Sequence, residues 1–208
     1  MRRTFYLPAI AGFLLSTAMA QADPPQIKGD YAVTGSANCV VAQGGFNAQL
    51  QPIPLPFPGG GISNLSFSIE GIRTFNGKGE GTVKATTVSV STGLTVQPHQ
   101  DFPVITGSAS SSMFTLSFTY NVQPDGVFTT ELVPGTFVST VLTGPNAGVT
   151  SALDKLSLTG LISNNGQTLT LASVEPVVET VTSSNGNVSY RVCHRSRVLT
   201  RMNPRKDD

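Results

Sequence analysis

The chain has 208 residues, of which only 12% are charged, while 21 are glycine and 14 are proline. Thirteen Lys and Arg against twelve Asp and Glu leave a formal charge of +1, which argues against a dedicated nucleic-acid-binding protein. The glycine and proline content indicates many turns but lies below the level at which disorder is expected. The length supports one folded domain and leaves little for a second.

The first twenty residues have the features of a secretory signal peptide. Arg2 and Arg3 precede an apolar run from Tyr6 to Leu15, and residues 18–20 supply the small side chains of a cleavage site. The apolar run is too short to span a membrane. We therefore expect cleavage after residue 20 or 22, no transmembrane segment in the mature chain, and a periplasmic or extracellular location. The paired arginines leave general secretory and twin-arginine export both open.

Two cysteines, Cys39 and Cys193, lie near the two ends of the mature chain. In an oxidising compartment such a pair predicts a disulfide, here joining the first strand to the last, with two buried free thiols as the alternative. The alternation around Cys193 places it on the face of Arg191 and Arg195, opposite the apolar face that includes Val192. A bulge near one cysteine, or a bridge at a strand end, would reconcile this arrangement with a disulfide.

Strand signals dominate the chain after residue 22, and helix signals are nearly absent. Phe114, Leu116, Phe118, Tyr120 and Val122 alternate with polar residues, which is the pattern of a strand with one buried face. The expected strands cover 30–42, 62–75, 81–92, 112–123, 127–133, 136–143, 149–162, 167–182 with a break at Pro176, and 187–199.

Turn motifs separate several of these strands and predict four hairpins, at Asn76-Gly77, Pro124-Asp125-Gly126, Asn165-Gly166 and Asn185-Gly186. Eight or nine antiparallel strands form either a closed barrel or a two-sheet sandwich. The cysteine pair favours the all-β barrel, because closure makes the first and last strands neighbours. We assign residues 23–199 to this domain and residues 200–208 to a basic flexible tail.

Three stretches carry a resemblance to known proteins: 29–39, with Gly29-Asp30-Tyr31-Ala32-Val33, Gly35 and Cys39; 75–81; and 118–126, with Phe118 to Val122 before Asp125-Gly126. This layout resembles that of uncharacterised secreted bacterial β-proteins, some of which are similar to the small calycin-type barrels that include allene oxide cyclase. The resemblance implies a barrel. It transfers no catalytic residue, and a shared fold does not determine function.

The segment 51–61 alternates prolines with Ile53, Leu55 and Phe57 and ends in Gly59-Gly60-Gly61. Each residue before a proline is extended, and one edge of the segment lacks N–H groups, so only the edge of Ile53, Leu55 and Phe57 could pair. One interpretation is an edge protected against aggregation. The other is an apolar flap over the barrel mouth, hinged at the glycines.

Basic residues concentrate at the C-terminus, and the set comprises Arg191, Arg195, Arg197, Arg201, Arg205 and Lys206. A solvated last strand and tail would explain them. Contact with an anionic surface, such as lipid head groups or an envelope polymer, is the functional alternative.

Signals for catalysis are weak. His99 and His194 have no partners at metal-ligand spacing if the cysteines are bridged, and no nucleophile elbow occurs, so we expect no metal and no cofactor. Four acids adjacent to turns, Glu70, Glu80, Asp125 and Glu131, are typical of solvated residues rather than of a glycosidase pair.

The leading hypothesis is a non-enzymatic barrel that binds a small apolar ligand or serves as a cell-envelope module, in an undetermined oligomeric state. The alternatives are an enzyme of the cyclase or isomerase type with a hydrophobic pocket, and an adhesion or structural protein. An interior cavity of about 300 Å³ or more would favour binding or catalysis. An interior filled by side chains would favour the structural role.

Overall fold

The computed structural model describes residues 26–56, 61–95, 104–163 and 165–202, and every regular element in them is a β-strand. This confirms the all-β prediction. None of these residues belongs to a helix long and apolar enough to cross a membrane. The strands are β1 (Lys28–Ala42), β2 (Ile62–Asn76), β3 (Glu80–Thr95), β4 (Val104–Val122), β5 (Val127–Leu132), β6 (Val138–Thr143), β7 (Thr150–Leu153), β8 (Ser157–Ile162), β9 (Thr168–Ala172), β10 (Val178–Ser183) and β11 (Val188–Arg201).

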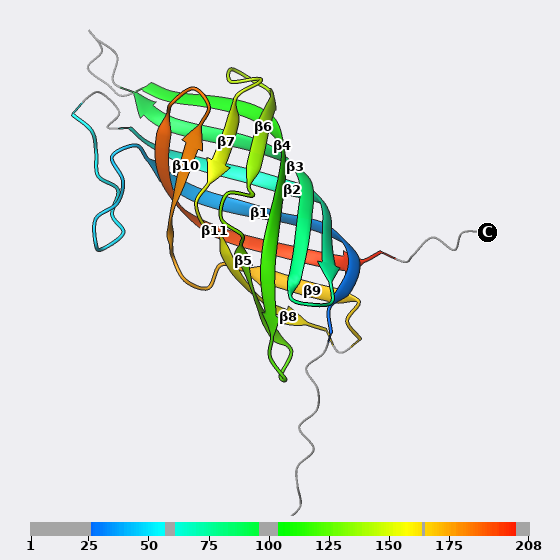
Figure 1. Cartoon of the computed structure of the whole chain (residues 1–208). Helices are drawn as coiled ribbons and strands as arrows, with labels where there is room; N and C mark the ends of the chain where they lie inside the picture. The colour runs from blue at the N-terminus through cyan, green and yellow to red at the C-terminus, as the bar shows by residue number, and fades with distance from the viewer. Residues whose placement is uncertain (1–25, 57–60, 96–103, 164, 203–208) are drawn as a thin grey trace, which may run out of the picture.

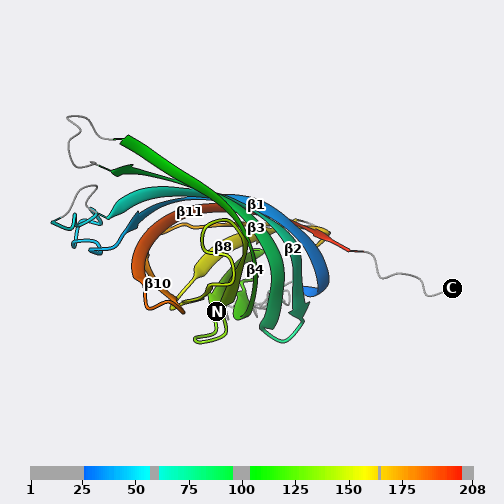
Figure 2. The same cartoon turned by 90° about the horizontal axis from the view of Figure 1, so that it is seen from above.

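The strands form one antiparallel sheet that closes on itself, because β1 pairs with β2 on one side and with β11 on the other. The β1–β11 seam runs from Tyr31 opposite Arg201 to Ala42 opposite Tyr190. Figure 2 shows the sheet curving round the interior. The first and last strands are therefore neighbours, as the cysteine pair predicted, and the sandwich alternative does not apply.

The barrel wall consists of long strands on one side and short strands on the other. Strands β1 to β4 and β11 are long, whereas the wall between β4 and β11 consists of two tiers of short strands (Figure 1). One tier is β5-β8-β9, joined to residues 118–122 of β4 and 196–200 of β11. The other is β6-β7-β10, joined to residues 111–115 of β4 and 188–192 of β11. Each tier with the five long strands makes a ring of eight.

The tiers explain why the structure has more strands than the sequence predicted. The range 149–162 divides into β7 and β8, because residues 154–156 cross from one tier to the other. Asp154 Oδ1 accepts a hydrogen bond from the Thr180 backbone N–H at 2.7 Å in one tier, and the Leu156 carbonyl accepts one from Leu132 at 2.8 Å in the other. The range 167–182 divides into β9 and β10 around the expected break at Pro176.

All four predicted hairpin turns are present, and each uses a glycine with positive φ. Gly77, Gly126, Gly166 and Gly186 have φ angles of 79°, 85°, 65° and 85°. Side chains other than glycine rarely adopt this conformation, so these residues set the turns between paired strands.

One end of the interior, here called the packed end, is filled with aromatic and leucine side chains where β1 begins. The Phe75 ring lies edge-on to Tyr31, Phe118, Tyr120 and Phe128, with centroid distances of 5.1–6.4 Å. Ile27 closes this end, and its carbonyl accepts a hydrogen bond from the Tyr120 hydroxyl at 2.8 Å. The leucines that complete this core are Leu158, Leu169, Leu171 and Leu199.

The opposite end, here called the open end, has small polar side chains on the inward positions of the same strands. Along β3, buried Val83 and Ala85 are followed by half-buried Thr87, Ser89 and Ser91. Along β4, buried Phe114 gives way to Ser112 and Ser110, which are half-buried, and then to exposed Ser108. The open end is therefore less filled and accessible to water.

Candidate functional site

The inward face of β11 carries arginine. Arg191, Cys193, Arg195, Arg197 and Leu199 alternate along one side of the strand, and all but the half-buried Arg191 are buried. The alternation of the strand predicted that this face points outward, because the opposite face includes apolar residues such as Val188. The structure corrects that assignment: Val188 is 43% exposed, and no bulge is needed to bring the cysteines together.

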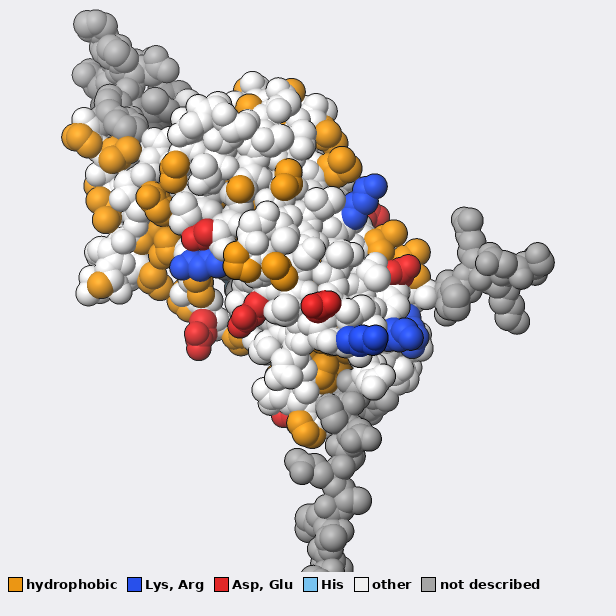
Figure 3. Space-filling model, viewed as in Figure 1, with side chains coloured by type: hydrophobic (Ala, Val, Ile, Leu, Met, Phe, Trp, Pro, Cys, Tyr) orange, Lys and Arg blue, Asp and Glu red, His pale blue; other side chains and the backbone are white. Residues whose placement is uncertain are grey.

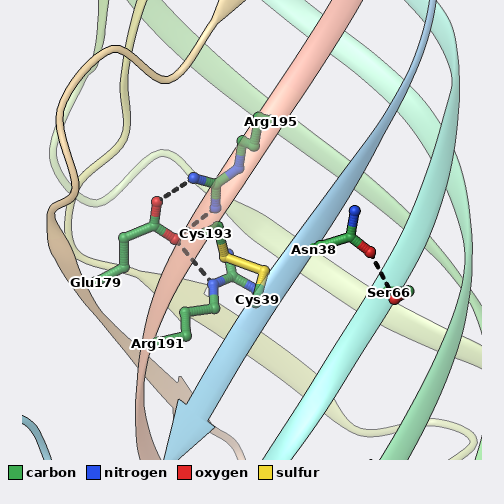
Figure 4. Close-up of a disulfide and its surroundings, with 7 residues drawn as sticks. All are labelled: Asn38, Cys39, Ser66, Glu179, Arg191, Cys193 and Arg195. Carbon is green, nitrogen blue, oxygen red and sulfur yellow. Dashed lines mark hydrogen bonds and ion pairs between the residues drawn. A yellow bond between two sulfur atoms is a disulfide. The ribbon is translucent and has the colours of Figure 1, made fainter. Parts of the chain in front are cut away.

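The predicted disulfide between Cys39 and Cys193 is present and joins β1 to β11 at the closing seam (Figure 4). The two residues are direct partners in the antiparallel pairing, with Cα atoms 4.1 Å apart. Both side chains are buried, and neither cysteine is free.

Glu179 of β10 binds two of these arginines. Its Oε2 accepts hydrogen bonds from Arg191 Nε at 2.8 Å and from Arg195 Nη2 at 2.6 Å, and its Oε1 lies 2.5 Å from Arg195 Nη1 (Figure 4). Glu179 and Arg195 are each 3% exposed. Such bidentate, charge-assisted pairs are strong where water is excluded.

Two further arginines, Arg73 of β2 and Arg197 of β11, are buried at 3% and 5% exposure without an anionic partner among the described residues. The Arg73 guanidinium lies 3.8 Å from the centre of the Phe118 ring, a cation–π contact. The Nε atoms of both arginines lack hydrogen-bond partners. Gly35 makes room for Arg197, because a Cβ there would lie 2.8 Å from Arg197 Cγ.

Burial lowers the pKa of both Arg197 and Arg73. Loss of solvent, followed by the charge of Arg195, lowers the pKa of Arg197 to about 9. Burial also lowers the pKa of Arg73 well below its ordinary value, and Arg197 adds to that effect. Because arginine holds its proton very tightly in proteins, we treat both as cations at neutral pH. Arg73, Arg191, Arg195, Arg197 and Glu179 are called the arginine layer below.

A cavity of about 170 Å³ lies between the arginine layer and the open end. Arg191, Arg195 and Arg197 contribute to its wall. The other lining residues are apolar or carry hydroxyl groups: Leu65, Phe67, Thr87, Ser89, Ser112, Phe114, Leu116, Phe137, Ser139, Val141, Ser151, Leu153, Leu156 and Val181.

A second pocket, of about 180 Å³ and here called the lateral pocket, opens through the wall between the two tiers of short strands. It shares Leu156 and Arg195 with the interior cavity. Acidic side chains are visible on this face of the molecule in Figure 3. The acidic residues that line the pocket are Glu131, Asp154, Glu175 and Glu179, and Lys155 accompanies them.

The proline-rich segment lies beside the end of β1, and none of its described residues lines the cavity. Ile53 is 43% exposed, Leu55 is half-buried, and Phe57 lies outside the described residues. The Ile53 N–H donates to the Gly45 carbonyl at 2.9 Å, so the edge expected to pair does so. A flap role for Ile53, Leu55 and Phe57 stays a prediction.

The predicted anionic-surface residues do not form one surface. Arg195 and Arg197 are buried, and Arg191 is half-buried and paired with Glu179, so these three do not lie exposed beside Arg201. Arg201 is exposed, and Arg205 and Lys206 lie outside the described residues.

The remaining candidates do not gather into a catalytic site. His194 is exposed and His99 lies outside the described residues. The four turn-adjacent acids Glu70, Glu80, Asp125 and Glu131 are all exposed. In the part of the chain that the structure describes, no three His, Cys, Asp or Glu residues lie close enough to hold a metal ion.

Glu179 and Arg73 were missed by the sequence analysis. The signal for the arginine layer was nevertheless available: a disulfide to inward-facing Cys39 requires Cys193 to point inward, and Arg191, Arg195 and Arg197 share its face.

Comparisons with known proteins identify no family. No family model and no curated protein matches the chain. A solved structure titled "Enduracididine Biosynthesis Enzyme MppR with HEPES Buffer Bound" is 12% identical over 95% of this chain and 97% of that chain, with a TM-score of 0.17. A score this low carries no inference about fold or function.

Proposed function

We propose that this protein is an exported, non-enzymatic binding protein whose small ligand places its apolar part in the cavity at the open end. The observation that supports the proposal is the cavity itself, which is bounded by Phe67, Phe114 and Phe137 and leads toward the accessible end of the barrel. The resemblance to calycin-type barrels belongs to the same proposal, as does a location outside the cytoplasm, with which the disulfide is compatible.

The volume limits the ligand. At about 170 Å³ the cavity does not reach the roughly 300 Å³ taken above as favouring binding or catalysis, so it can enclose only a small ligand or part of a larger one. An engineered apolar cavity of about 150 Å³ in another protein binds benzene. The enclosed part of the ligand is therefore about the size of one aromatic ring or a short branched chain.

The walls favour a largely apolar guest. Phe114 and Phe137 stack with centroids 5.5 Å apart and present one aromatic wall. Two of the lining hydroxyls already bond to a neighbouring hydroxyl, Ser89 Oγ to Ser110 Oγ at 2.9 Å and Ser151 Oγ to Ser183 Oγ at 3.0 Å, and so need no ligand to satisfy them. A barrel with a purely structural role has no need for small side chains on the inward positions of this end.

The test is to fill the cavity. Thr87 lines it, whereas Val88, the next residue on β3, points outward and is 58% exposed. We expect Thr87→Trp to abolish binding of toluene, measured by ligand-observed NMR, while Val88→Trp binds as the wild type does. Both variants should retain the wild-type circular dichroism spectrum. Failure of the wild type to bind toluene, or equal binding by all three proteins, would contradict the proposal.

A further inference from the structure

The charges inside the barrel are unbalanced. The arginine layer holds four guanidinium groups and one carboxylate, a sum of +4 − 1 = +3. Both oxygens of Glu179 are already engaged by Arg191 and Arg195. A buried charge without a counter-charge is strongly unfavourable, so Arg73 and Arg197 are the residues that require explanation.

Among the residues that the structure describes, no packed element pairs a carboxylate with Arg73 or Arg197. The acids on β1 to β3, Asp30, Glu70 and Glu80, are exposed on the outer side of the wall. On the short strands and their connections, Glu131, Asp154 and Glu175 are exposed at the lateral pocket, and none forms an ion pair with Arg73 or Arg197.

Arg197 is placed to meet a ligand. It lines the cavity, is 5% exposed, and has an Nε–H without an acceptor. A guanidinium presents its N–H groups as a planar fork that matches the two oxygens of a carboxylate. Arg73 and Arg197 also line a void of about 10 Å³, room for roughly one water-sized group. Glu131 lines this void too, but it is exposed and forms no ion pair with either arginine.

We infer that the arginine layer is an anion-binding site, and that the ligand is a small organic acid whose carboxylate is held at Arg197 while its apolar part lies in the cavity. This inference rests on the proposed function for the apolar part and adds the chemical class of the ligand. Inorganic phosphate or sulfate shares the anionic chemistry but would leave the aromatic wall unused, so the experiment separates the two.

The route of entry follows from charge. The lateral pocket presents Glu131, Asp154 and Glu175 against Lys155, which disfavours an approaching anion. At the open end the inward residues are neutral hydroxyls such as Ser89 and Ser112. The acid therefore enters from the open end.

Binding and structural roles of Arg197 have opposite signatures in stability. Replacing an unpaired buried charge with an apolar side chain of similar length stabilises a protein. We expect Arg197→Met to raise the melting temperature of the ligand-free protein by about 2–4 °C and to weaken acid binding. An arginine needed for the fold would instead lower the melting temperature when replaced.

The experiment compares benzoate with benzamide, a neutral molecule of nearly the same shape, by calorimetric titration at pH 7. For the wild type we expect benzoate to bind at least about tenfold more tightly than benzamide, because a charged hydrogen-bonded pair is the added interaction. Arg197→Met should abolish the difference and Arg197→Lys should retain part of it. Arg201→Met, which removes an exposed arginine from the same strand, should bind as the wild type does.

The outcomes distinguish the two claims. Equal affinity for benzoate and benzamide, with toluene still bound, overturns the anion site and leaves the proposed function standing. If neither aromatic probe nor toluene binds, both claims fail as stated. In that case melting temperatures in sodium sulfate and in sodium chloride of equal ionic strength test whether the arginine layer binds an inorganic anion instead. Stabilisation by sulfate that is lost in Arg197→Met would assign the layer to an inorganic anion.

Discussion

The two ends of the barrel interior are built by the same long strands and filled in opposite ways. On β2, Phe75 lies at the packed end against four other aromatic rings, whereas Phe67 lies at the open end and is half-buried. On β3, the inward side chains pass from Val83 to Ser89. Continuous strands thus provide a densely packed core at one end and a cavity at the other without any change of backbone architecture.

The arginine layer lies where these regions meet. Arg73 packs on Phe118 of the packed end, while Arg191 and Arg197 line the cavity of the open end. The packed end supplies rigid support for the buried charges, and the cavity supplies access to them. Stability and the proposed binding thus depend on different lengths of the same strands, and substitutions can test the two separately.

The largest expected difference is between two phenylalanines of β2. We expect Phe75→Ala to lower the free energy of unfolding by about 3–5 kcal/mol, because it removes the ring at the centre of the aromatic cluster. Phe67→Ala should cost only about 1 kcal/mol, because its ring is half-buried and borders a cavity. Urea denaturation measures both values, and equal losses would refute the contrast between the ends.

Loss of the buried Glu179 carboxylate should lower the free energy of unfolding nearly as much as loss of the Phe75 ring. Glu179→Gln removes the one carboxylate that forms ion pairs with the arginine layer among the described residues, and we expect a loss of about 3 kcal/mol in the free energy of unfolding. Glu175→Gln, at an exposed acid only four positions earlier, is the control and should change stability by less than about 0.5 kcal/mol. A small effect at Glu179 would mean that water already solvates the positive charge of the arginine layer.

The disulfide closes a long loop, because its cysteines are 154 positions apart in the sequence. The double substitution Cys39→Ala and Cys193→Ala should lower the free energy of unfolding by about 2–4 kcal/mol. Hydrogen exchange should report greater opening of the β1–β11 seam near the cysteines than near Leu199 at the packed end, where the core also holds the strands together. Uniform loss of protection along the seam would contradict the comparison.

Local signals in the sequence predicted most of the wall. The four glycine turns, the cysteine pair and most of each long strand follow from chain chemistry that acts over a few residues or through one covalent bond, although residues 104–111 of β4 were not predicted as strand. The two tiers could not be predicted in this way. Whether 149–162 is one strand or two depends on its partners, since β7 pairs with β6 and β10 while β8 pairs with β5 and β9.

The candidate site was harder to predict for a physical reason. Alternation divides a strand into two faces but does not say which face is inside. On β11 the apolar residues face outward at Val188 and Val198, and the arginines face inward because Glu179, from another strand, engages two of them. A charge that is balanced from a distant strand leaves no local signal of burial.

Two glycines of β3 provide the finest test of the contrast, since each substitution adds one methyl group. At Gly81, in the packed end, a Cβ would lie 2.3 Å from Phe118 Cζ, so Gly81→Ala should cost about 1–3 kcal/mol through overpacking. At Gly93, in the open end, the nearest atom is Ser63 Cβ at 3.6 Å, an ordinary contact, and neither glycine has positive φ. Gly93→Ala should therefore leave stability unchanged or raise it by about 0.4–1 kcal/mol, because alanine restricts the unfolded chain. Thermal denaturation of the two variants measures opposite signs if the ends differ as described, whereas a similar loss at both would show that the open end is packed as tightly as the other.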